Sequence, residues 1–192
     1  HPSIPRIYDY FTKNERAYLV MELIVGENLD IILSRTTSFF SESQIISWAL
    51  ELCDVISYLH SHSPEPIVFR DIKPTNIILT NQNHLMLVDF GIAKIFESGT
   101  KNTMVGTQGY APPDQYRGEA TPAVDIYGLG ATFHHLLTLK DPKLEPPFSF
   151  SERPIETISP AVSPELVSVI NKSLEYSPED RYKSVNEMKN AI

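Results

Sequence analysis

Hydrophobic and polar residues near the N-terminus follow the pattern of two strands and a turn. Residues 6–11 (RIYDYF) and 16–24 (RAYLVMELI) are rich in aromatic and branched side chains, and the polar residues 12–15 separate them. This pattern predicts a β-hairpin. A bend at Gly26 is then expected to lead into a short helix.

Residues 41–63 carry the clearest helical periodicity. Ser41 and Gln44 have the spacing of a capping box, and Ser63-Pro64 is expected to end the helix. The apolar stripe is broad and consists of Ile45, Ile46, Ala49, Leu50, Leu52, Cys53, Ile56 and Leu59. A stripe of this width predicts a central, largely buried helix.

The rest of the chain is predicted to be mainly helical. Two short strands are expected at 76–80 and 85–88, whereas residues 92–121 lack periodicity and predict a long loop. A loop of that length within a compact domain is usually functional. The proline-rich segment 141–160 is expected to be mostly irregular. Further helices are expected over 122–138, 164–175 and 184–192.

Composition and charge narrow the classes of function. The 192 residues, 42% hydrophobic and 21% charged, fit one soluble globular domain or a domain plus a fragment. A net charge of −8 argues against a general binder of nucleic acid or anionic membranes. The single cysteine, Cys53, excludes an intrachain disulfide and suits a reducing, cytoplasmic compartment. No apolar run has the length of a membrane span, although a membrane tether in the full-length protein stays open.

Several polar motifs follow one another in an order that suits a metal and a phosphate. R-D-x-K-x-x-N at 70–76 is followed by Asp89-Phe90-Gly91, and the later motifs are GTQGYAPPD (106–114), DIYGLG (125–130) and Arg181 in SPEDRY. Each motif alone is weak, but the ordered set is specific. Over essentially the whole chain, this set resembles the protein kinase family, in the form common among bacterial serine/threonine kinases.

The resemblance implies an α+β, protein-kinase-like fold: a mainly helical C-terminal lobe with a residual N-terminal β-hairpin. Residues 1–25 would be a remnant of the small lobe with the hinge, and residues 26–192 would be the large lobe. The catalytic loop would span 69–76 and the activation segment 89–114. The implied reaction transfers the γ-phosphoryl group of ATP, with Mg²⁺, to serine or threonine hydroxyls of a protein substrate.

The same resemblance assigns roles to the polar residues. Asp71 would orient or accept the proton of the attacking hydroxyl, and Lys73 would stabilise charge on the γ-phosphate. Asn76 and Asp89 would hold Mg²⁺, which prefers oxygen ligands. Thr107 would reach back toward Asp71 and Lys73. The alternative is that Asp71 and Asn76 merely cap turns.

Residues of the hairpin and its neighbouring strands would form the adenine pocket. Met21 would be the gatekeeper, and the backbone of Glu22 and Ile24 would hydrogen-bond adenine. Ile78 and Val88 would line the pocket floor, although simple core packing suits both equally well.

Regulation is expected in the long loop. Arg70 would pair with a phosphorylated loop residue, for which Ser98, Thr100 and Thr103 are the candidates. The alternative is an exposed, unmodified loop. Phe69 stands where the family has His, and we expect it to fill the buried column with Phe90 without inactivating the enzyme.

Three charged residues would have structural roles. Asp125 would hydrogen-bond the backbone of the catalytic loop, or merely complement its helix dipole. Asp114 stands where the family has Glu and would pair with Arg181. Because the aspartate is one methylene shorter, we expect that ion pair to be shifted or bridged by water.

The sequence has no glycine-rich G-x-G-x-x-G loop and begins with His1 rather than Met. The resemblance therefore implies a fragment of a kinase that is inactive alone. A truncated pseudokinase that acts as a binding or scaffold module is the alternative, and the reading frame upstream of His1 distinguishes the two. A small-molecule phosphotransferase is disfavoured because GTQGYAPPD resembles a peptide-substrate loop. A hairpin without further strands would be marginal, so we expect it to be disordered, swapped or paired with a second molecule.

Overall fold

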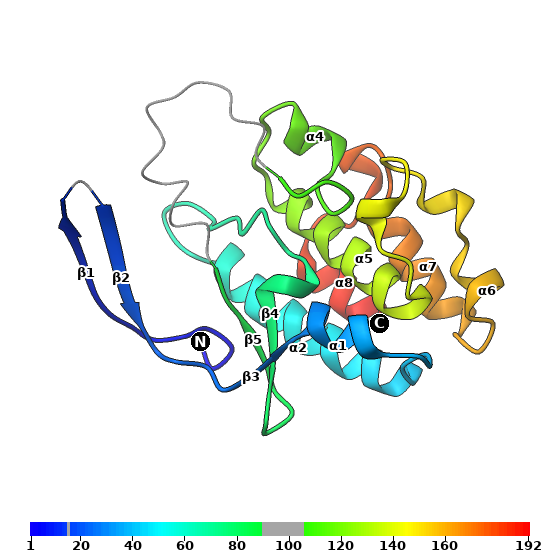
Figure 1. Ribbon diagram of the computed structural model, residues 1–192. Helices are drawn as coiled ribbons and strands as arrows, with labels where there is room; N and C mark the ends of the chain where they lie inside the picture. The colour runs from blue at the N-terminus through cyan, green and yellow to red at the C-terminus, as the bar shows by residue number, and fades with distance from the viewer. Residues whose placement is uncertain (15, 90–105) are drawn as a thin grey trace.

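The N-terminal residues form the predicted hairpin. The computed structural model describes residues 1–14, 16–89 and 106–192. Strand β1 (Ile7–Lys13) pairs antiparallel with β2 (Arg16–Met21), and Lys13 lies opposite Arg16, so the strands continue further than expected into the polar turn. All of β1 is exposed, and the hairpin stands apart from the helices (Figure 1).

A second sheet contains one strand that the sequence pattern missed. Strand β3 (Gly26–Asn28) pairs antiparallel with β4 (Ile77–Thr80), which pairs antiparallel with β5 (Leu85–Leu87). The sequence G-E-N has little strand propensity, and pairing with β4 is what makes it a strand. A Cβ at Gly26 would lie 2.3 Å from the carbonyl oxygen of Leu79, so this close approach requires glycine.

Side-chain caps define the starts of the first two helices. In α1 (Leu29–Arg35), the Asn28 side chain accepts from the N–H of Ile31 at 2.9 Å. In α2 (Glu42–His60), the Ser41 hydroxyl accepts from the N–H of Gln44, which is one of the two hydrogen bonds of the predicted capping box. Helix α2 ends at His60, three residues before the expected end at Ser63.

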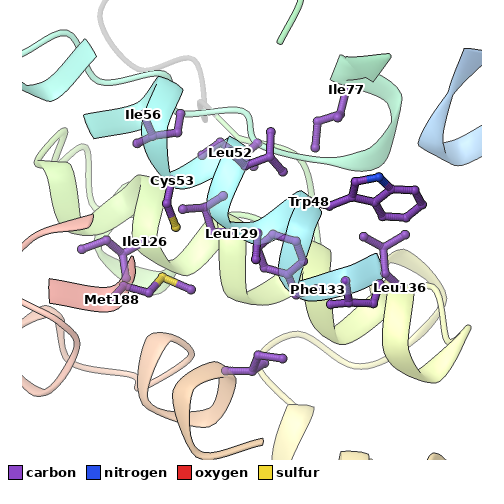
Figure 2. Close-up of a cluster of buried hydrophobic side chains, with 14 of the residues drawn as sticks. Trp48, Leu52, Cys53, Ile56, Ile77, Ile126, Leu129, Phe133, Leu136 and Met188 are labelled. Carbon is purple, nitrogen blue, oxygen red and sulfur yellow. The ribbon is translucent and has the colours of Figure 1, made fainter. Parts of the chain in front are cut away.

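Helix α5 (Pro122–Thr138) has the predicted bounds and lies at the centre of the molecule. Every residue from Val124 to Thr138 is buried. It packs against α2 and α8 (Val185–Ala191), and side chains from these helices interdigitate with one from β4 (Figure 2). The labelled members of this core are Trp48, Leu52, Cys53, Ile56, Ile77, Ile126, Leu129, Phe133, Leu136 and Met188.

Single-turn elements fill the segments that were expected to be irregular. Helix α4 (Pro113–Tyr116) lies in the predicted loop, and α6 (Ile155–Ile158) lies in the proline-rich stretch, before α7 (Pro164–Ser173). One turn of helix has no hydrophobic period, so sequence periodicity could not reveal either. Single 3-10 turns occur at Pro74–Asn76, Pro142–Leu144, Phe150–Glu152 and Pro178–Asp180. Over the described ranges, no helix combines the length and the hydropathy of a membrane span.

Candidate active site

The backbone of the predicted catalytic loop, residues 69–76, is held by a buried carboxylate on α5. Asp125, 1% exposed on α5, accepts the N–H of Phe69 at 2.8 Å and the N–H of Arg70 at 2.7 Å. The ring of His60, at the end of α2, lies 2.8 Å from the same carboxylate. The expected contact between Asp125 and the loop backbone is therefore present. The role of Asp125 is not limited to complementing its helix dipole.

Asp71, Lys73 and Thr107 form a closed ring of hydrogen bonds. The Lys73 ammonium lies 2.8 Å from Asp71 Oδ2 and 2.6 Å from Thr107 Oγ1. The Thr107 hydroxyl donates to Asp71 Oδ1 at 2.7 Å. The segment that begins at residue 106 is thus joined side chain to side chain with the loop, in the manner expected for Thr107.

The orientation of the Asn76 amide is fixed by two hydrogen bonds. Its Nδ2 donates to the backbone carbonyl of Asp71 at 2.9 Å and to Asp71 Oδ2 at 3.1 Å. Because Nδ2 can only donate, Oδ1 is the Asn76 atom that can coordinate a cation. Asn76 is 5% exposed, so this oxygen is presented from a buried position.

Asp89 is brought to the same end of the sheet. The N–H of Val88 donates to the carbonyl of Asn76 at 2.9 Å, and Asp89 is the next residue. Asp89 is exposed and has φ 64°, a left-handed conformation that is uncommon for a residue other than glycine. One carboxylate and one amide oxygen are a donor set that suits Mg²⁺.

The expected adenine-binding residues lie at the end of the hairpin and directly after it. Met21 ends β2 and is half-buried, as are Glu22 and Ile24. The N–H of Glu22 donates to the Arg6 carbonyl at 2.8 Å, so this N–H is already used within the protein. The predicted contact of the Glu22 backbone with adenine would therefore use its carbonyl.

Ile78 and Val88, the two residues expected at the pocket floor, are half-buried. Neither belongs to the cluster of buried core side chains. Partial exposure is compatible with a pocket-lining position, and the role of both residues at the pocket floor stays a prediction.

The Asp114–Arg181 ion pair is direct, and the expectation of a shifted or water-bridged pair is wrong. Arg181 Nη2 lies 2.7 Å from Asp114 Oδ1, and Nη1 lies 3.2 Å from Oδ2. Both side chains are fully buried. The two-point contact compensates for the shorter side chain because α4 carries Asp114 into the interior.

A neutral pair of rings anchors the segment after Thr107. The Tyr110 hydroxyl lies 2.7 Å from Nδ1 of His135 on α5. Burial raises the pKa of Tyr110 and lowers the pKa of His135, so both groups are held in their uncharged forms. This contact fixes the GTQGYAPPD segment against the central helix.

Sequence reasoning missed Gln115, which contacts the loop, and His60, which contacts the carboxylate that holds the loop. His60 faces Asp125, and the Gln115 side-chain amide donates to the Arg70 carbonyl at 2.8 Å. His60 follows no motif. Gln115 stands directly after Asp114, so its place beside a recognised motif was the only signal.

Some expected residues lie outside the described part of the chain. These are Phe90, Ser98, Thr100 and Thr103. Phe69 is 4% exposed and packs in the main core, whereas Arg70 is exposed. The stacking of Phe69 on Phe90 and the pairing of Arg70 with a phosphorylated residue stay predictions.

Known proteins with similar sequences are protein kinases by name. Serine/threonine-protein kinase B of Synechocystis is 34% identical over 205 residues, which cover 100% of this chain and 35% of that protein. Serine/threonine-protein kinase PknB of Mycobacterium leprae is 31% identical over 206 residues, which cover 98% of this chain and 32% of that protein. The chain therefore spans about a third of the length of the curated relatives it matches.

Solved structures show the same fold. The apo form of PpkA-294 is 25% identical with a TM-score of 0.80, covering 100% of this chain and 68% of that chain. The PknI kinase domain of Mycobacterium tuberculosis is 22% identical with a TM-score of 0.77, covering 100% of this chain and 71% of that chain. The model of the protein kinase domain family matches residues 1–191. The predicted protein-kinase-like fold is thereby confirmed, and the chain belongs to the protein kinase domain family.

Proposed function

We propose that this chain carries the catalytic residues of a serine/threonine protein kinase. Such an enzyme transfers the γ-phosphoryl group of ATP to serine or threonine hydroxyls of a protein substrate. The ring of hydrogen bonds that joins Asp71, Lys73 and Thr107 supports this proposal most directly. The curated relatives named above support the same activity.

Asp71 acts on the attacking hydroxyl of the substrate. Hydrogen bonds from Lys73, Asn76 and Thr107 fix the direction of its carboxylate. Each carboxylate oxygen can accept more than one hydrogen bond, so the carboxylate can also receive the hydroxyl of serine or threonine. Positioning of this kind supplies much of the rate in phosphoryl transfer, which needs little covalent help from the protein.

Lys73 supplies positive charge beside the reacting group. Its ammonium has three protons, and two of them face Asp71 and Thr107. Within the described ranges, the third proton is left for a phosphate oxygen. A fixed cation beside a developing negative charge lowers the barrier without reorganisation during the reaction.

The residues present fit Mg²⁺ and ATP. Asn76 Oδ1, which accepts only a long hydrogen bond from the Thr75 hydroxyl (3.4 Å) among the described residues, and the exposed carboxylate of Asp89 would hold Mg²⁺. Held there, Mg²⁺ would supply positive charge that offsets the negative charge of the ATP phosphates. Met21, the carbonyl of Glu22 and the backbone of Ile24 would line the adenine site.

The division into lobes is part of the same proposal. Residues 1–25 would be the hinge side of the small lobe, and residues 26–192 would be the large lobe. Regulation would act through Arg70 and a phosphorylated Ser98, Thr100 or Thr103. The lone cysteine, Cys53, is free and buried, which supports a reducing, cytoplasmic location.

The 192-residue chain by itself is proposed to be inactive or nearly so. Its sequence holds no glycine-rich loop, and such a loop covers the phosphates in protein kinases. The same observation favours a second candidate function, a pseudokinase that binds partners without transferring phosphate. The presence of Asp71, Lys73, Asn76 and Asp89 favours the active enzyme.

Phosphate transfer to casein by the full-length protein and by the 192-residue chain tests these proposals. We expect the full-length protein to be active and Asp71→Asn to abolish its activity. The matched control is Asp54→Asn, which removes an exposed carboxylate on α2 paired only at the surface with Lys189 and should leave activity unchanged. A full-length protein that transfers no phosphate would favour the pseudokinase. Asp71-dependent transfer by the 192-residue chain would refute its inactivity.

A further inference from the structure

The peptide unit of Arg70 is held in an unusual conformation. Arg70 has φ 69°, in the left-handed region that residues other than glycine rarely adopt. Its N–H donates to Asp125 at 2.7 Å, and its carbonyl accepts from Gln115 Nε2 at 2.8 Å. The residue immediately before Asp71 is therefore clamped on both sides by side chains from distant parts of the chain.

Gln115 is well placed to act as one half of this clamp. It is 3% exposed and lies on α4, after the segment that carries Thr107. The orientation of its amide is chemically determined, because only Nε2 can donate to the Arg70 carbonyl. Gln115 Oε1 is buried and has no hydrogen-bond partner among the described residues, so the single bond to Arg70 is the polar contact that this side chain supplies.

Gly106 packs directly over the Gln115 amide. A Cβ built on Gly106 would lie 3.2 Å from Gln115 Nε2 and 2.6 Å from Ala111 Cβ. Gly106 also has φ 149°, which disfavours a side chain. Gly106, which precedes Thr107, therefore packs on the same Gln115 amide that binds the carbonyl of Arg70.

We propose that Gln115 is a positioning residue for phosphoryl transfer. By holding the backbone of Arg70, Gln115 fixes the position of the Asp71 carboxylate, and it also couples the 106–107 segment to the catalytic loop. Left-handed conformations of larger residues persist only where surrounding contacts enforce them. Removal of the Gln115 hydrogen bond lets the Arg70 peptide rotate and takes the Asp71 carboxylate out of line. The inference rests on the proposed kinase function.

The experiment compares Gln115→Met, Gln115→Asn and Gln115→Glu in the full-length protein. Met keeps the length without a donor, and Asn keeps the amide without the reach. We expect both to lower kcat for a serine-containing peptide about tenfold, the effect of one lost hydrogen bond. KM for ATP should stay unchanged, because neither variant alters the adenine site. The matched control is Gln82→Glu, a substitution at an exposed turn residue, which should change neither constant.

Gln115→Glu adds a readout that simple loss of packing would not produce. A glutamate can donate to the Arg70 carbonyl only when it is protonated, and burial raises the pKa of such a carboxyl. The kcat of this variant relative to the unsubstituted protein should therefore rise as the pH falls from 8 toward 6, whereas the ratio for Gln115→Met should stay flat.

Hydrogen exchange at the Arg70 amide supplies a measurement independent of catalysis. We expect faster exchange in Gln115→Met, with unchanged exchange in α5. A kcat within twofold of the unsubstituted protein, or unchanged exchange at Arg70, would overturn the inference while leaving the kinase proposal intact. Absence of Asp71-dependent transfer in the unsubstituted protein would instead refute the proposed function, and the role of Gln115 in phosphoryl transfer would fall with it. If Gln115→Met does not fold, the same measurements on Gln115→Asn decide the matter.

Discussion

The guanidinium of Arg181 meets the carboxylate of Asp114 in a two-point contact across 67 residues of sequence, with both side chains fully buried. Arg181 also donates to three carbonyl oxygens, and its guanidinium lies 5.0 Å from the Tyr127 ring centroid. The three carbonyls belong to Ala123, Glu175 and Tyr176. The ion pair therefore ties α4, which follows the Thr107 segment, to the C-terminal part of the chain.

Breaking this pair should be strongly destabilising. We expect Asp114→Asn to lower the free energy of unfolding by about 3–5 kcal/mol, because it leaves a buried guanidinium unpaired. Arg181→Met should cost more, since it also leaves the three carbonyl oxygens without their donor. Urea denaturation at pH 7 measures both changes.

The exposed pair between Lys189 and Asp54 provides the control. Removing its carboxylate with Asp54→Asn should change the free energy of unfolding by less than about 1 kcal/mol, because surface ion pairs contribute little. An equally small loss for Asp114→Asn would show that the buried pair is not a major source of stability.

Long periodic elements were predictable from the sequence, and short ones were not. The bounds of α5 matched the prediction, and α2 was placed within three residues, because a helix of several turns shows its buried face as a repeat. Strand β3 and helix α4 are too short to show a period. Their conformation depends on neighbours that lie far away in sequence.

The candidate site also contains residues that the sequence could reveal and residues that it could not. Asp71, Lys73 and Asn76 fall within seven residues of one another, so a local motif was enough to single them out. The contacts of His60 and Gln115 depend on how the helices pack, and no local pattern encodes them. Ion-pair geometry was also beyond the sequence: side-chain length alone wrongly suggested a bridging water between Asp114 and Arg181.

The Thr107 hydroxyl is expected to matter for catalysis more than for stability. Thr107→Val keeps the shape but removes a group that accepts from Lys73 and donates to Asp71. We expect kcat of the full-length protein to fall about 10- to 100-fold, equivalent to one or two hydrogen bonds, with little change in KM for ATP. Thr107→Ser, which retains the hydroxyl, should keep most of the activity. Full kcat in Thr107→Val would refute this role.

Stability should fall at mildly acidic pH because of a buried histidine. His134 is 1% exposed, its Nε2 donates to the Arg153 carbonyl at 2.9 Å, and burial lowers its pKa to about 4. In the unfolded chain, the His134 ring becomes protonated as the pH falls below its ordinary pKa of 6.5. In the folded protein, the same ring becomes protonated only as the pH approaches about 4. Lowering the pH through this window therefore favours the unfolded state, by about 2 kcal/mol at pH 5 relative to pH 8.

Urea denaturation of His134→Gln between pH 5 and pH 8 checks this linkage. The variant lacks the titrating ring but retains a side-chain donor, so its loss of stability on acidification should be smaller. His84→Gln, at a histidine whose side chain is 73% exposed, should keep the slope of the unsubstituted protein. Equal slopes for all three proteins would contradict the assignment to His134.

The β1–β2 hairpin is expected to drive self-association of the 192-residue chain. Its sheet has two strands, so each strand has an edge that pairs with no other described strand. Large apolar side chains are exposed on it, including Tyr8 at 64% and Val20 at 42%. Unprotected strand edges of this kind recruit further strands, and charged side chains on an edge strand prevent this pairing.

Light scattering after size-exclusion chromatography measures the effect. The mass of the chain should rise with protein concentration, and the double substitution Tyr8→Lys and Val20→Lys should return it to the monomer value. Tyr58→Lys, at a tyrosine that is 54% exposed on α2, adds charge away from the hairpin and should leave the association unchanged. A monomer at every concentration, or equal suppression by Tyr58→Lys, would show that the hairpin edge does not recruit a second copy.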